Sequence, residues 1–179
     1  MHFWRFVLAS LAVVSFVACS SHVQAQAPIT PGPEHAVLQE TVGTWDATMK
    51  MPDGSEERGV HKAESTCNGL WIASQFQMEF GGQKFEGRGM DGYDPEKKKY
   101  VSVWVDSMSP SVMILEGDFD KKSKTLTMKG EGKGPGGRTT TFKSVTIMKD
   151  KNQHTFEMYL LGSDGKEDLM MTIEYRRKS

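Results

Sequence analysis

The regular spacing of turn-forming residues constrains the fold of this chain more than any other feature. From Gly43 onward, stretches rich in β-branched and aromatic residues alternate with turn signals at residues 52–54, 81–82, 94–96, 120–123, 134–137, 150–152 and 163–165. These intervals leave no room for the crossover helices that join parallel strands. The pattern therefore predicts an all-β domain built as a meander of antiparallel hairpins.

Between the turns, the sequence predicts about ten strands. They are expected to begin near Thr44, Glu56, Leu70, Lys84, Tyr100, Val112, Thr125, Thr139, His154 and Asp168. An open sheet of that length would leave two edges exposed, whereas closure removes both. We therefore expect an up-and-down antiparallel β-barrel, with a two-sheet sandwich as the alternative. One short helix is predicted before it at residues 33–40, because Pro33 suits a first helical turn and Gly43 follows the end.

The N-terminal segment differs from the rest of the chain. His2 and Arg5 precede an apolar run, residues 6–18, that is too short to span a bilayer as a helix. It predicts a signal peptide over residues 1–25, and hence an exported, periplasmic protein. Two cleavage sites compete. Residues 16–21 resemble a lipobox with Cys19 as the acylated residue, and residues 23–25 suit ordinary signal peptidase; we favour the lipobox as the more specific pattern.

Residues 26–33 carry few charges and read as a flexible tether that leads into a barrel domain over residues 34–179. Either cleavage leaves Cys67 as the only other cysteine, so the domain is expected to hold no internal disulfide and to depend on its core. The 22 basic and 23 acidic residues form short mixed runs without a basic stripe. Nucleic acid is therefore not an expected partner, and a membrane is expected only through the lipid anchor.

Residue parity along the strands predicts which side chains face the interior. The third strand turns Ile72, Phe76 and Met78 to one face, and its polar residues to the other. Charged residues on the second strand must face water, which turns His61 and Cys67 inward. Similar patterns place further apolar residues inside, namely Met113, Leu115, Phe119, Leu126, Met128, Phe156, Met158, Leu160, Leu169, Met171, Ile173 and Tyr175.

Barrel closure would bring the first strand, which begins with Gly43-Thr44-Trp45, beside the last, which ends with Tyr175-Arg176-Arg177. Parity favours Arg177 as the arginine that stacks on the Trp45 indole, in a cation–π contact worth roughly 0.5–2 kcal/mol. This pair is predicted to seal one end of the barrel.

The same residues carry a resemblance. A Gly-x-Trp at the first strand with a late arginine is similar to the calycin group, which includes lipocalins, fatty-acid-binding proteins and haem-binding nitrobindins. Residues 87–89, 92–94, 100–108, 116–117 and 175–178 more closely resemble the bacterial family of unknown function numbered 1579, over about residues 33–178. That resemblance implies the barrel fold and brings no established activity.

The interior is the candidate functional site. Methionine is abundant, with 12 residues, and its flexible side chain suits a cavity that adapts to irregular apolar shapes, although core packing would use the same residues. Small inward residues such as Gly59, Ala63, Gly87, Gly89 and Gly117 indicate spare volume. The candidate ligand-binding residues are His61, Cys67, Phe76, Met78, Trp104, Asp106, Met113 and Met158.

No catalytic or metal-binding pattern is recognised. The serines lack the context of a nucleophile, no histidine pair has zinc-ligand spacing, and residues 132–137 precede a strand and not a helix. The carboxylates Asp91, Asp94, Glu116 and Asp118 are expected in turns and on the surface. The protein is thus more readily interpreted as a binder than as an enzyme.

Three functional hypotheses follow. The first is a module that binds a small hydrophobic or amphipathic molecule inside the barrel, without a cofactor. The second is a haem-binding or isomerase-like calycin in which His61 or His154 binds iron or moves a proton. The third is a structural or interaction domain with a filled core, which presents Trp71 and its outward neighbours to a partner.

Overall fold

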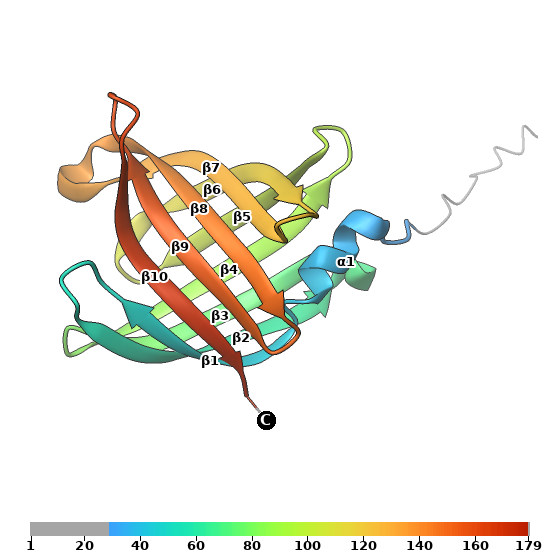
Figure 1. The fold of residues 1–179 in the computed structure, drawn as a ribbon, viewed down its shortest axis with the longest axis horizontal. Helices are drawn as coiled ribbons and strands as arrows, with labels where there is room; N and C mark the ends of the chain where they lie inside the picture. The colour runs from blue at the N-terminus through green and yellow to red at the C-terminus, as the bar shows by residue number, and fades with distance from the viewer. Residues whose placement is uncertain (1–28, 179) are drawn as a thin grey trace, which may run out of the picture.

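The structure is a computed structural model and describes residues 29–178. Ten antiparallel strands follow one another around a closed barrel, and the last pairs with the first (Figure 1). They are β1 (Gly43–Lys50), β2 (Glu56–Thr66), β3 (Trp71–Phe80), β4 (Gln83–Asp94), β5 (Lys99–Asp106), β6 (Ser109–Asp120), β7 (Thr125–Lys133), β8 (Thr139–Asp150), β9 (Gln153–Leu161) and β10 (Glu167–Arg177). The predicted up-and-down barrel is confirmed, and the sandwich is excluded. The predicted signal peptide, Cys19 and residues 26–28 of the predicted tether lie outside the described residues.

The predicted strand starts agree with the structure to within one residue, except for the sixth. That strand was expected near Val112 and begins at Ser109. Pro110 normally disfavours a strand interior, but here it lies beside a register shift between Trp104 and Asp106 on β5, where ladder hydrogen bonding is already interrupted.

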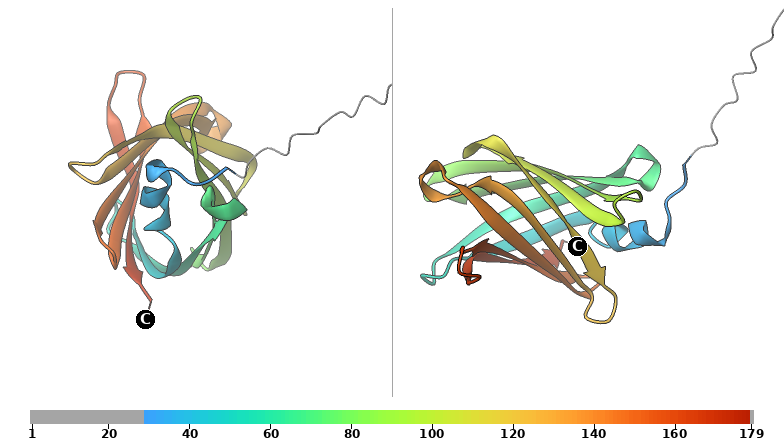
Figure 2. Two further views of the ribbon diagram at one scale, coloured as in Figure 1. Left: turned by 90° about the vertical axis from the view of Figure 1, so that its right-hand side faces the viewer. Right: turned by 90° about the horizontal axis from the view of Figure 1, so that it is seen from above.

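Helix α1 (Pro33–Gln39) covers one end of the barrel. It lies within the ring of strands in the left view of Figure 2. Its Leu38 is buried in the core, the Tyr100 hydroxyl donates to the carbonyl oxygen of Glu34 at 3.0 Å, and Gln39 Nε2 donates to the carbonyl oxygen of Gly69 at 3.1 Å. Among the described residues, no helix is long and apolar enough to cross a membrane.

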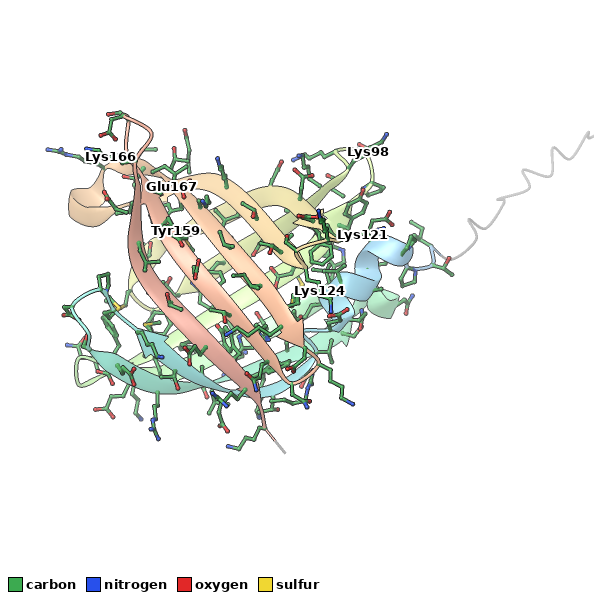
Figure 3. All side chains as sticks on the ribbon, in the orientation of Figure 1. Lys98, Lys121, Lys124, Tyr159, Lys166 and Glu167 are labelled. Carbon is green, nitrogen blue, oxygen red and sulfur yellow. The ribbon has the colours of Figure 1, made fainter. Side chains whose placement is uncertain are left out.

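The two ends of the barrel are therefore distinct. We call the end that holds α1 the closed end; it also carries the β2–β3, β4–β5, β6–β7 and β8–β9 turns. The other end, with the β1–β2, β3–β4, β5–β6, β7–β8 and β9–β10 turns, is the open end. In Figure 3, Lys98, Lys121 and Lys124 mark the closed end, whereas Lys166 and Glu167 mark the open end.

The predicted closure contact is present at the closed end. The Arg177 guanidinium lies 4.0 Å from the centre of the Trp45 ring, and the two residues are partners in the β1–β10 register. Arg177 Nη1 also donates to the carbonyl oxygen of Val42 at 2.7 Å, while the Trp45 indole donates to that of Thr41 at 2.8 Å. Gly43 is required here, because its φ is +142° and a Cβ would lie 2.3 Å from Arg177 Nη1. Arg177 thus joins β10 through a hydrogen bond to the segment that follows α1.

Two predicted inward positions are wrong because the backbone is locally irregular. A bulge on β10 between Leu169 and Met171 resets the alternation, so Leu169 is 41% exposed, while Met170 and Met171 both face the interior. Strand β2 ends at Thr66, and Cys67 lies in a left-handed turn with φ of +49°. The Cys67 side chain is exposed.

Candidate functional site

A cavity of about 650 Å³ occupies the barrel interior. It extends from Leu38 and Thr41 at the closed end to Met51, Phe80 and Met108 at the open end. Its volume lies within the range of about 300–1,000 Å³ that is typical of small-molecule sites. The interior is therefore not the filled core that the interaction-domain hypothesis requires.

Methionine dominates the cavity wall. Ten of the 12 methionines line the cavity, the other two being Met1, which lies outside the described residues, and Met90, which is 38% exposed on the outer face. Unbranched thioether side chains repack at low cost around irregular apolar shapes. The wall is consequently apolar and adaptable over most of its area.

Of the eight predicted ligand-binding residues, seven line this cavity. They are His61, Phe76, Met78, Trp104, Asp106, Met113 and Met158. The eighth, Cys67, does not, because the chain turns before its side chain can enter the barrel.

The inward glycines of β4 do not leave empty space, contrary to the prediction. A Cβ on Gly87 would lie 2.1 Å from the Trp104 ring, and one on Gly89 would lie 2.4 Å from Ser74 Oγ and 3.3 Å from the same ring. The indole of Trp104 therefore lies across the backbone of both glycines. Its Nε1 donates to Asp106 Oδ2 at 2.9 Å, while Asp106 Oδ1 accepts the Met108 amide at 2.9 Å. Asp106 thus fixes the indole and the β5–β6 turn.

A chain of rings crosses four strands near the closed end. His154 stacks on Tyr175 with ring centres 4.5 Å apart, and it meets the edge of Trp45 at 4.4 Å. His61 meets Tyr175 at 5.2 Å in an edge arrangement. Burial lowers the pKa of His61 to about 4, and burial, with smaller contributions from His61 and Arg177, lowers the pKa of His154 to about 3. Both imidazoles are therefore neutral at pH 7.

Asp91 was expected in a turn or on the surface, and this prediction is wrong. Its side chain lines the cavity opposite Ser102 in the β4–β5 register. Burial raises the pKa of Asp91 to about 6, and a hydrogen bond with the Ser102 side chain partly offsets that rise. The sequence could have predicted this inward position, because Asp91 has the same parity along the strand as the inward Gly87 and Gly89. The other three carboxylates are on the outside: Asp94 accepts turn amides, and Glu116 and Asp118 pair with Lys97 and Lys99.

Two polar atoms on the cavity wall are buried without a hydrogen-bond partner in the part of the chain that the structure describes. They are His61 Nδ1 and Ser144 Oγ, and Ser144 is fully buried between the methionines of β7 and β9. An unpaired buried polar group costs about 1–3 kcal/mol. Each of these two groups is therefore a cost to the stability of the barrel.

Within residues 29–178, no group of three or more His, Cys, Asp or Glu side chains is placed to hold a metal ion. For haem iron, His154 is poorly suited because its ring is stacked on Tyr175 and edge-on to Trp45. The Nδ1 of His61 is buried in the wall. His154 and the Nδ1 atom of His61 are therefore poorly placed to bind haem iron.

Comparisons with known proteins support the fold. The S-type phycobiliprotein lyase from Guillardia theta matches with 9% identity over 82% of this chain and 93% of its own, at a TM-score of 0.52. A fluorescence-activating β-barrel designed de novo matches with 18% identity over 78% of this chain and 95% of its own, at a TM-score of 0.45. The lyase comparison supports the barrel fold alone, because only 9% of the aligned residues are identical.

Comparison with curated protein sequences gave no match. The family model described as protein of unknown function (DUF1579) matches residues 30–177. This range spans all ten strands and α1. The chain therefore belongs to the DUF1579 family.

Proposed function

We propose that the protein binds a small hydrophobic or amphipathic molecule inside the barrel. The observation that carries the proposal is the 650 Å³ cavity, whose wall is mainly methionine and aromatic side chains. A hydrophobic space of this size is unfavourable to leave filled with water, and an apolar molecule would gain roughly 25 cal/mol per Å² of apolar surface removed from water.

The route of access follows from the difference between the ends. Helix α1 packs into the closed end, and Tyr100 and Gln39 hold it there through hydrogen bonds. At the open end, Met108 is 67% exposed and Val112 is 50% exposed, and both border the cavity. A ligand would enter there, since its apolar surface could slide along side chains that are already exposed.

Native mass spectrometry tests this function directly. The protein is purified from cells without detergent and measured intact, then again after denaturation. A reproducible extra mass that disappears on denaturation is the expected result, and its value identifies the ligand class, a haem included. A bare mass, combined with no uptake from a panel of fatty acids, fatty alcohols, fatty amines, isoprenoids and haem, would contradict the proposal.

Export belongs to the same proposal and rests on the sequence of residues 1–25. We expect Cys19 to be acylated after cleavage, so that the protein is recovered with the membrane fraction of the producing bacterium. The Cys19→Ser variant should move to the soluble fraction. Recovery of a chain that still begins at Met1 would contradict export.

A further inference from the structure

The charged side chains of the cavity are unevenly placed. Asp106 and Lys133 lie at the open end, at the ends of β5 and β7. Both carboxylate oxygens of Asp106 already accept hydrogen bonds, from Trp104 and from the Met108 amide. Asp91 lies deep in the barrel, eight positions along β4 from its start at the open end and close to its end beneath α1. It is thus the one carboxylate of the described wall that can meet the inner end of a ligand.

Asp91 lacks a countercharge within the described residues. The ion pairs of the structure join other side chains, and the partner that acts on the Asp91 carboxylate is the Ser102 side chain. With a pKa of about 6, the carboxylate is largely ionised at pH 7 and above. A carboxylate that faces the cavity without a countercharge remains undercompensated, so a cation brought to it gains strongly.

The deep part of the described cavity offers no positive charge to a ligand carboxylate. His61 and His154 are neutral there, because burial lowers the pKa of each. Arg177 faces the other way, with its guanidinium bound to the carbonyl oxygens of Val42, Glu40 and Lys151. An anionic head would therefore meet Asp91 without any positive side chain to offset the repulsion.

The Trp104 ring adds an aromatic surface on the same side of β4 as Asp91. The Trp104 ring lies over Gly87 and Gly89, the two residues that precede Asp91 on the same face of β4. Indole rings attract cations more strongly than other aromatic side chains do. From there, methionines line the way to the open end.

We propose that the cavity selects apolar molecules that carry one protonated amine, with the ammonium paired to Asp91 and the apolar part extended toward the open end. This inference rests on the proposed function and names its ligand class. Within the described chain no arginine lines the cavity, so the wall holds no guanidinium for a carboxylate head.

The test compares three ligands with the same apolar chain: dodecylamine, dodecanol and dodecanoate. Each is titrated calorimetrically into the full chain at pH 8, below the concentration at which it forms micelles. The amine should bind at least about tenfold more tightly than the alcohol, as expected for a charge pair away from bulk water, and the carboxylate more weakly than the alcohol.

Two variants test whether Asp91 is the source of the preference for the amine. Asp91→Asn should abolish the advantage of the amine and leave dodecanol affinity within about threefold of the parent protein. Asp118→Asn removes an equal charge from the outer face, where Asp118 pairs with Lys99, and should leave the order of the three ligands unchanged. The Asp91→Asn protein should unfold at a temperature no lower than the parent, because a buried charge has been removed.

Equal affinity for the amine and the alcohol, or an unchanged amine preference in Asp91→Asn, would overturn this inference and leave the proposed function standing. Tight binding of dodecanoate would also overturn it. Failure of all three ligands to bind, together with a bare native mass, would overturn the proposed function as well.

Discussion

The closed and open ends of the barrel are built from different kinds of contact. At the closed end, Trp45 is 1% exposed, Leu38 is 4% exposed, and Arg177 joins the last strand to the backbone after α1 through hydrogen bonds. At the open end, apolar side chains such as Met108 border the cavity while remaining exposed. The closed end therefore has the contacts of a structural seal, whereas the open end is the proposed opening for a ligand.

The largest expected effect comes from breaking the closed end. Trp45→Ala should lower the free energy of unfolding by about 3–5 kcal/mol, because it removes a fully buried indole and its contacts with Arg177 and His154. Urea unfolding followed by circular dichroism measures the change. Met108→Ala at the open end is the matched control, and it should stay within about 0.5 kcal/mol of the parent protein. Comparable losses in both variants would remove the distinction between the ends.

A second effect follows from the buried histidines beside the closed end. Burial lowers their pKa values from 6.5 to about 4 for His61 and to about 3 for His154. As the pH falls through 6.5, these histidines therefore become protonated in the unfolded chain but stay neutral in the folded chain. At pH 5 each histidine should lower the free energy of unfolding by about 2 kcal/mol relative to alkaline pH. Asp91, whose pKa is raised, should increase it by about 1 kcal/mol. The net loss between pH 8 and pH 5 is therefore about 3 kcal/mol.

Urea unfolding at a series of pH values measures this loss. His154→Phe keeps a ring against Tyr175 and Trp45 and removes one titrating group, so it should roughly halve the histidine contribution to the pH dependence. Stability that stays constant from pH 7 to pH 5 in the parent protein would contradict the burial of these imidazoles.

The smallest expected effect lies at the open end. Met108→Asp should leave stability within about 0.5 kcal/mol, because Met108 is 67% exposed. It should weaken dodecanol binding by about fivefold, since a partly buried apolar contact worth roughly 1 kcal/mol is replaced by a carboxylate at the opening. The matched control is Leu169→Asp, an exposed apolar residue of β10 that does not line the cavity. Equal weakening in both variants would place the opening elsewhere.

The sequence predicted the architecture well because its signals are local. Turn residues mark hairpins, and alternation marks faces, so nine of the ten strand starts and most inward positions agree with the structure. The prediction failed where the backbone departs from regular strand geometry, as at the left-handed turn of Cys67 and the bulge before Met171. Alternation cannot report such irregularities, because it assumes an uninterrupted strand.

The site was only partly predictable, because its polar groups meet through contacts between distant strands. The rings of Trp45, His61, His154 and Tyr175 come from β1, β2, β9 and β10, and only the register of the closed barrel brings them together. Asp91 could have been placed from parity alone. It was assigned to the surface by residue type, since carboxylates are rarely buried without a partner.

The most direct test of ligand binding in the cavity is a calorimetric titration of dodecanol into the parent protein and into Ser144→Phe. Ser144 is fully buried, lines the cavity and has a hydroxyl without a partner in the described chain. A phenyl ring there would fill part of the cavity and remove the unpaired hydroxyl. The account predicts binding to the parent protein and affinity at least about tenfold weaker in the folded variant. Equal affinity in the two proteins, or no binding to the parent, would contradict it.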